Sequence, residues 1–184
     1  MLISAPIIIA AIYIRPVYAE IDSENTYQRG LAAYSNTSIK RDAITAASLF
    51  KEAALQGHSE AAFSLGVLYQ NGEGVSKDSN EAVQWYTRAA EQNHLKAQFN
   101  LGLLLFEGIG LARDPTLGFH WFQKAADQGY AKAQYRVGCA YLSGQGVPKN
   151  HALAIDWLSK AAKQNDTDAI HTLELARELY AHKR

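Results

Sequence analysis

The chain has 184 residues, with 18 Lys and Arg side chains against 18 Asp and Glu, and 48% of its residues are apolar. This length predicts one domain, and the apolar content excludes a disordered chain. A net charge of zero argues against a nucleic-acid partner, because phosphate binding needs a surplus of cations. The single cysteine, Cys139, excludes an intrachain disulfide and any site with several cysteine ligands.

The N-terminal segment is apolar and differs from the rest of the chain. Residues 2–14 would span about 20 Å as a helix, which is shorter than the hydrocarbon core of a membrane. Small residues follow at Val17 and Ala19, so the segment is typical of a signal peptide, residues 1–19, cleaved after Ala19. No basic residue precedes the apolar run. An uncleaved membrane anchor or a misplaced start therefore remains an alternative, and so does a cytoplasmic location.

The remaining chain repeats with a period of 36 residues. Trp85, Trp121 and Trp157 follow this spacing, and so do Gly66, Gly102 and Gly138. Each repeat is predicted to contain a first helix, a glycine-containing loop and a second helix. The mid-helix glycine is unfavourable for a helix, and its expected use is the close approach of a neighbouring helix.

The loops carry residues that end one helix and begin the next. Paired glycines follow the first helix and can take a left-handed conformation that ends it. Asp78, Asp114 and Asn150 are N-cap residue types, with Asp42 at the same phase, and Asp78 with Glu81 is typical of a capping box. The second helix is expected to pack Ala82, Trp85, Tyr86, Ala89 and Ala90.

The pattern A-x(3)-LG-x(2)-Y-x(2)-G-x-GV-x(2)-D-x(3)-A-x(2)-WY-x(2)-AA-x-QG resembles the Sel-1-like repeat, a relative of the tetratricopeptide repeat. The resemblance implies an all-α fold, a right-handed α-solenoid of about four 36-residue helix-turn-helix repeats. The expected domain covers residues 20–184, with repeats at about 25–58, 59–94, 95–130 and 131–166. Residues 167–184 are expected to form a capping helix, because Glu174 replaces the repeated glycine.

A polar stripe on the first helices is the candidate binding surface. Its positions vary between repeats: Glu60, Lys96 and Lys132; Ser64, Asn100 and Arg136; Asn71, Glu107 and Ser143. In tetratricopeptide-like solenoids these helices line the concave face, so this resemblance predicts that Lys96, Asn100, Lys132 and Arg136 grip an acidic or carbonyl-rich segment. Tyr69, Leu105 and Tyr141 are expected to flank the stripe with apolar surface. An ordinary solvated helix face is the alternative.

Other residue patterns predict no chemistry. The histidines form no pair with metal-ligand spacing, the GxG loops lack the context of a phosphate site, and Cys139 occupies an apolar helix position. Ser48 and Lys51 match Ser-x-x-Lys without the companion motifs of a β-lactam enzyme. We therefore expect no cofactor and no metal.

The family resemblance implies a non-enzymatic adaptor that binds another protein, and exported bacterial members often serve envelope assembly or cell-wall enzymes. From the apolar N-terminal segment we expect a periplasmic or secreted protein, with membrane attachment only if that segment is retained. An intracellular or membrane-anchored assembly scaffold is the alternative function. A β-lactam-interacting enzyme is a further alternative, although the cysteine pairs of such relatives are missing.

Overall fold

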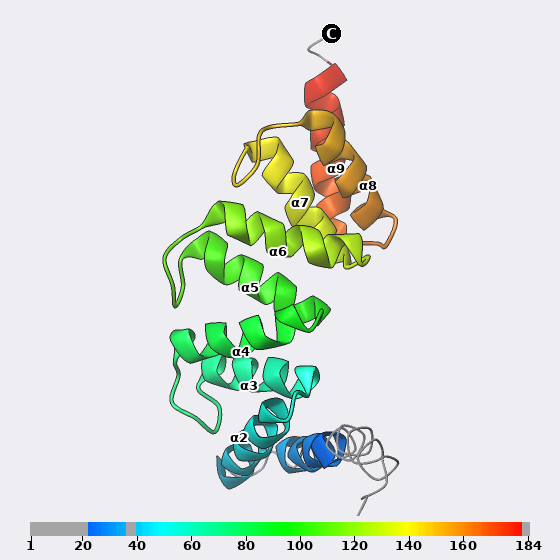
Figure 1. Ribbon diagram of the computed structural model, residues 1–184. Helices are drawn as coiled ribbons and strands as arrows, with labels where there is room; N and C mark the ends of the chain where they lie inside the picture. The colour runs from blue at the N-terminus through cyan, green and yellow to red at the C-terminus, as the bar shows by residue number, and fades with distance from the viewer. Residues whose placement is uncertain (1–21, 36–39, 182–184) are drawn as a thin grey trace, which may run out of the picture. The chain divides into compact units, whose positions relative to one another are not determined.

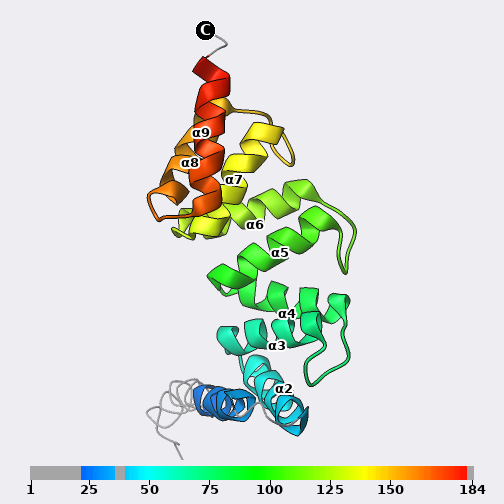
Figure 2. The same cartoon turned by 180° about the vertical axis from the view of Figure 1, so that it is seen from behind.

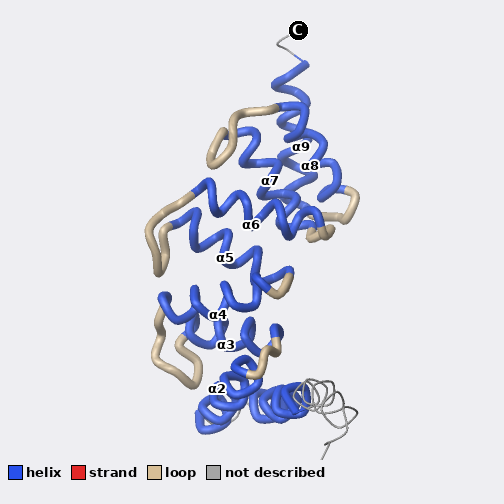
Figure 3. The backbone as a smooth tube through the Cα atoms, in the orientation of Figure 1, coloured by secondary structure: helices blue, strands red, loops and turns tan. Residues whose placement is uncertain are grey.

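The computed structural model describes residues 22–35 and 40–181, so the predicted signal peptide lies outside the described part of the chain. Figure 3 shows helices joined by loops and turns, and the described residues contain no strand. The chain divides into two compact units, one ending at Gln92 and the other beginning at Asn93.

The first unit contains two helix pairs (Figure 1). A helix over residues 22–35 precedes α2 (Lys40–Leu55), and these are followed by α3 (Ser59–Asn71) and α4 (Ser79–Glu91). Helices α3 and α4 pack against each other, and α2 packs against α3.

The second unit has the same plan with one additional helix. It contains α5 (Leu95–Glu107), α6 (Pro115–Asp127), α7 (Ala131–Ser143), α8 (His151–Ala162) and α9 (Thr167–Ala181). Helices α5 and α6 form one pair, α7 and α8 form the next, and α9 packs along α8, as the rear view in Figure 2 shows. We call the helix at 22–35, α3, α5, α7 and α9 the A helices, and α2, α4, α6 and α8 the B helices.

The repeated caps explain where the helices begin and end. The carboxylate of Asp78 accepts hydrogen bonds from the backbone N–H groups of Asn80 and Glu81, and Asp114 caps α6 in the same manner. At the other end of the A helices, Gly72 has a φ of 78°, a left-handed conformation that glycine adopts without strain.

Two expected caps are wrong. The N–H of Asp78 bonds to the carbonyl of Tyr69, and the Glu81 carboxylate accepts the indole N–H of Trp85, so the predicted capping box does not close. Helix α2 begins at Lys40, which places Asp42 in its first turn rather than at its N-cap.

Within each repeat, the mid-helix glycine lets the A helix touch a large side chain of its B helix. A Cβ atom on Gly102 would lie 2.6 Å from the ring of Phe122, and one on Gly66 would lie 2.7 Å from the ring of Tyr86. Gly138 faces Leu158 in the same way. The predicted close approach is therefore confirmed, and the contacted atoms are mainly those of one buried side chain from the B helix.

The predicted buried face of the second helix is also confirmed, since Ala82, Trp85, Tyr86, Ala89 and Ala90 are the buried residues of α4. The corresponding faces of α6 and α8 are less completely buried, because their tryptophans, Trp121 and Trp157, are only half-buried. The all-α fold of helix-turn-helix repeats is confirmed. None of the described helices combines the length and the hydropathy needed to cross a membrane.

Candidate functional site

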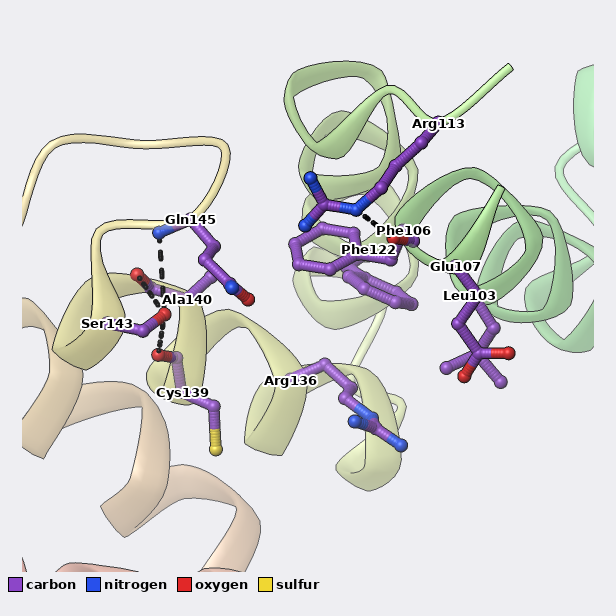
Figure 4. A pocket seen from close by; sticks show the side chains of 10 residues that line it. All are labelled: Leu103, Phe106, Glu107, Arg113, Phe122, Arg136, Cys139, Ala140, Ser143 and Gln145. Atoms are coloured by element: carbon purple, nitrogen blue, oxygen red, sulfur yellow. Dashed lines mark hydrogen bonds between the residues drawn. The ribbon is translucent and has the colours of Figure 1, made fainter. Parts of the chain in front are cut away.

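A pocket of about 260 Å³ opens on the A-helix face of the second unit, between α5 and α7. Its lining includes Leu103 and Phe106 from α5, Cys139 and Ala140 from α7, and the buried ring of Phe122. Figure 4 shows these side chains together with Glu107, Arg113, Arg136, Ser143 and Gln145. The pocket therefore combines an apolar floor with a polar rim.

Two arginines are the main charged groups of this rim. The Nε–H of Arg113 donates a 2.9 Å hydrogen bond to the backbone carbonyl of Phe106, which holds the side chain over the pocket (Figure 4). The guanidinium carbon of Arg136 lies 6.0 Å from the centre of the Tyr135 ring. Among the described residues, neither guanidinium forms an ion pair, although Glu107 lines the same pocket.

Cys139 brings a thiol to the pocket. Burial raises the pKa of this thiol, while a hydrogen bond with Tyr135 and the positive charge of Arg136 act in the opposite direction. The thiol is therefore predominantly protonated at neutral pH and is a weak nucleophile. Cys139 is half-buried and packs against the core of α8 and α9 from its apolar helix position.

A second pocket, of about 160 Å³, occupies the equivalent place in the first unit. The shift between the two pockets is 72 residues, or two repeats, because Leu31 and Phe50 of one correspond to Leu103 and Phe122 of the other. The main differences in lining are that Ser64 of the first unit stands where the second unit has Arg136, and Val67 stands where it has Cys139. Among the side chains that the structure describes, the lining of this second pocket is Leu31, Tyr34, Phe50, Phe63, Ser64, Val67 and Leu68, without a charged group.

The structure places part of the predicted stripe at these pockets. Arg136, Glu107 and Ser143 line the pocket of the second unit, and Ser64 lines that of the first. Lys132 lies instead in a separate hollow with Tyr130 and Asp166. Lys96 is exposed on α5, and Asn100 is half-buried.

The three expected apolar flanks do not border the stripe. Tyr69 and Tyr141 follow Ser64 and Arg136 by five residues, which is about 140° around a helix. The ring of Tyr141 packs edge-on against Phe119 of α6, at 5.4 Å, and Leu105 is only 2% exposed. The expectation for these three residues is therefore wrong, because the turn of the helix carries them away from the stripe.

The tryptophans contribute to structure on the B helices. Lys124 lies 4.5 Å from the centre of the Trp121 ring, and Lys160 lies 3.9 Å from that of Trp157. In α4, Arg88 lies over Trp85 in the corresponding arrangement, at 5.9 Å. These cation–π contacts cover aromatic surface that would otherwise meet water.

Sequence reasoning missed several residues that matter. His58 and His94 cap α3 and α5, because each Nδ1 accepts a backbone N–H, from Ala61 and Ala97 respectively, at 3.1 Å. Arg113 was also missed. The signal for Arg113 was a basic residue at the same position of every repeat, the others being Arg41, Lys77 and Lys149.

The Sel1 repeat model matches residues 27–58, 59–94, 95–130 and 131–166. The chain belongs to the Sel1 repeat family. Sel1 repeat proteins are generally protein–protein interaction modules, and their fold is typically a non-enzymatic scaffold. Among the curated proteins, no sequence matches this chain.

Solved structures of Sel1 repeat proteins are similar to this chain. The protective antigen c5321 of uropathogenic Escherichia coli, described as having an SLR fold, is 36% identical with a TM-score of 0.78; the match covers 82% of this chain and 32% of that one. A Sel1 repeat protein from Oxalobacter formigenes is 34% identical with a TM-score of 0.78, over 82% of this chain and 62% of the other. Cysteine rich protein B of Helicobacter pylori is 25% identical with a TM-score of 0.53, over 63% and 86% of the two chains. The chain thus spans less than two thirds of the first two relatives.

Proposed function

We propose that this Sel1 repeat protein is a non-enzymatic adaptor of the cell envelope that binds a segment of a partner protein on its A-helix face. In α-solenoids this face forms the concave binding surface. The observation that carries the proposal is the pocket between α5 and α7, which lies on that face and includes Arg136 and Glu107 of the variable stripe.

The pattern of variation along the repeats supports a recognition role. The core positions keep the same character from repeat to repeat, as the contacts of Gly66, Gly102 and Gly138 demonstrate. The exposed positions of the A helices instead change in charge and size, from Ser64 to Arg136 for example. Variable side chains on a constant scaffold are suited to selecting one partner.

The envelope location rests on the sequence of the N-terminal segment. An apolar run that is too short to span a membrane, followed by Val17 and Ala19, favours export with cleavage after Ala19. A cell-wall or envelope enzyme is then the expected class of partner. An intracellular or anchored scaffold would use the same A-helix face.

Purification of the tagged full-length protein from its native cells tests this proposal. We expect the mature protein to begin at Glu20 and to capture an envelope protein, and we expect Arg136→Glu to weaken this capture. Arg177→Glu, a matched change on the exposed part of α9, serves as the control. Retention of Met1 with cytosolic partners would contradict the location, and equal capture by both variants would contradict the binding face.

A further inference from the structure

The pocket of the second unit places two cationic groups beside an apolar floor. Arg113 comes from the loop before α6 and Arg136 from α7, and both side chains line the pocket. The floor includes Leu103, Phe106 and Phe122. An anionic group at the rim and an apolar group on the floor could therefore be bound together.

Arg113 is held in place without using its terminal nitrogens. Its Nε–H already donates a hydrogen bond to the Phe106 carbonyl, and this bond holds the guanidinium group beside the pocket. The two Nη groups remain available for a carboxylate, which matches the planar donor set of a guanidinium. Arg136, without an acidic partner among the described residues, supplies a second such group.

The size of the pocket limits what it can hold. A volume of about 260 Å³ lies below the range of typical small-molecule and cofactor sites, roughly 300–1,000 Å³. It suits one large side chain of a protein. The equivalent pocket of the first unit keeps the apolar character but has Ser64 in place of Arg136, so the positive charge at this one position belongs to the second unit.

We propose that this pocket binds an acidic segment of a protein partner, with a carboxylate at Arg113 and Arg136 and a neighbouring large apolar side chain on the floor of Leu103, Phe106 and Phe122. This inference rests on the proposed function and names the chemistry of the partner. Glu107 of α5 lies on the same rim and repels a second carboxylate there. This repulsion favours one orientation of the bound segment. The carboxylate comes from an Asp or Glu side chain or from a chain terminus, and the two sources can be separated by experiment.

Cys139 provides a reporter for the test, because it lines the pocket and is the single cysteine of the chain. The rate of its alkylation by iodoacetamide is measured on the full chain while short peptides are added. The first peptide is acetylated and amidated Gly-Glu-Phe-Gly. Matched peptides replace Glu by Gln or Phe by Ala, and a fourth, Gly-Gln-Phe, ends in a free carboxylate. Concentrations reach about 10 mM, which would nearly saturate a site of millimolar Kd.

We expect the Glu-Phe peptide to protect Cys139 saturably, with protection at least about tenfold weaker for the Gln-Phe and Glu-Ala peptides. Protection by the free-terminus peptide instead of the Glu-Phe peptide would identify a chain terminus as the source of the carboxylate, and would still support the proposal. Arg113→Gln and Arg136→Gln should each weaken protection at least about threefold. Arg177→Gln is the matched control and should leave it unchanged.

Equal protection by all four peptides, or no protection by any of them, would overturn the proposal. This result is distinguishable from a failure of the proposed function. If Arg136→Glu still reduces capture of a cellular partner while no peptide protects Cys139, the A-helix face binds a partner without a carboxylate at this pocket. Circular dichroism spectra and melting temperatures of the arginine variants verify that they are folded.

Discussion

The imidazole of His58 and the carboxylate of Glu24 are 2.8 Å apart, measured from Nε2 to Oε2, and they join α3 to the helix over residues 22–35. The same imidazole stacks on Tyr27 and caps α3 through Nδ1. Because Nδ1 accepts an N–H, this arrangement requires the proton of the neutral ring to lie on Nε2, where it is donated to Glu24. The His58 side chain thus connects two helices and caps the N-terminus of one of them, α3.

The contact predicts a dependence of stability on pH. Hydrogen bonds from Gln28 and His58 hold the pKa of Glu24 below its ordinary value of 4.5. A carboxyl group with a lowered pKa stabilises the fold above its unfolded pKa, and this contribution is lost as the pH falls through the folded pKa. We therefore expect Glu24→Gln to flatten the decrease in melting temperature below about pH 4.5. Glu91→Gln on α4 is the control, and parallel curves for natural protein and Glu24→Gln would contradict the prediction.

Replacement of the glycine in α5 tests the close contact between helices. Ala is a better helix former than Gly by about 1 kcal/mol, so Gly102→Ala would stabilise an isolated helix. Here the new methyl group would meet the ring of Phe122, which is 1% exposed, and we expect a loss of about 1–3 kcal/mol in the free energy of unfolding. Urea unfolding measures it. Asn100→Ala on the same helix is the comparison, and a gain in stability for Gly102→Ala would refute the packing argument.

In the second unit, two buried glutamines each accept a hydrogen bond from a glutamine at the end of the following helix. The amide of Gln164 donates to the side-chain oxygen of Gln134 at 2.8 Å, and Gln128 donates to Gln98 in the same register at 2.9 Å. Gln164→Ala would leave the Gln134 oxygen without this donor, so we expect a loss of about 1–3 kcal/mol. In a double-mutant cycle, Gln134→Leu combined with Gln164→Leu should lower the free energy of unfolding by less than the sum of the two single changes to Leu. Additive losses would show that the bond contributes nothing specific.

The thiol of Cys139 should react slowly. Since burial raises its pKa, the thiolate is less populated than in an exposed cysteine, and the pH profile of alkylation should be displaced to higher pH. The reference is the variant Cys139→Ser with Glu178→Cys, which moves the thiol to an exposed position of α9 outside the pocket. Equal rates at pH 7 and superimposable profiles would mean that the pocket does not shield Cys139.

Much of the candidate site could be predicted from the sequence, because helical spacing alone places Glu107 and Arg136 on one face of their helices. Arg113 could not be placed in this way. It lies in a loop, and only the hydrogen bond from its Nε to Phe106 carries it to the pocket. The tyrosines lie away from the stripe for a simpler reason, since a step of five residues turns the helix by about 140°.

The sequence by itself determined the repeat, its period and its helix pairs, because each helix must bury an apolar stripe and a 36-residue register repeats the same stripe. Only the tertiary structure decided which side chains of neighbouring helices meet. Contacts such as those of His58 with Glu24 and Gln134 with Gln164 join residues about 30 positions apart, and their geometry depends on how successive helices pack. The pocket has the same origin, since its walls come from separate helices. Of its two positive charges, Arg136 stands at a position that varies between repeats and Arg113 at one that is basic in every repeat.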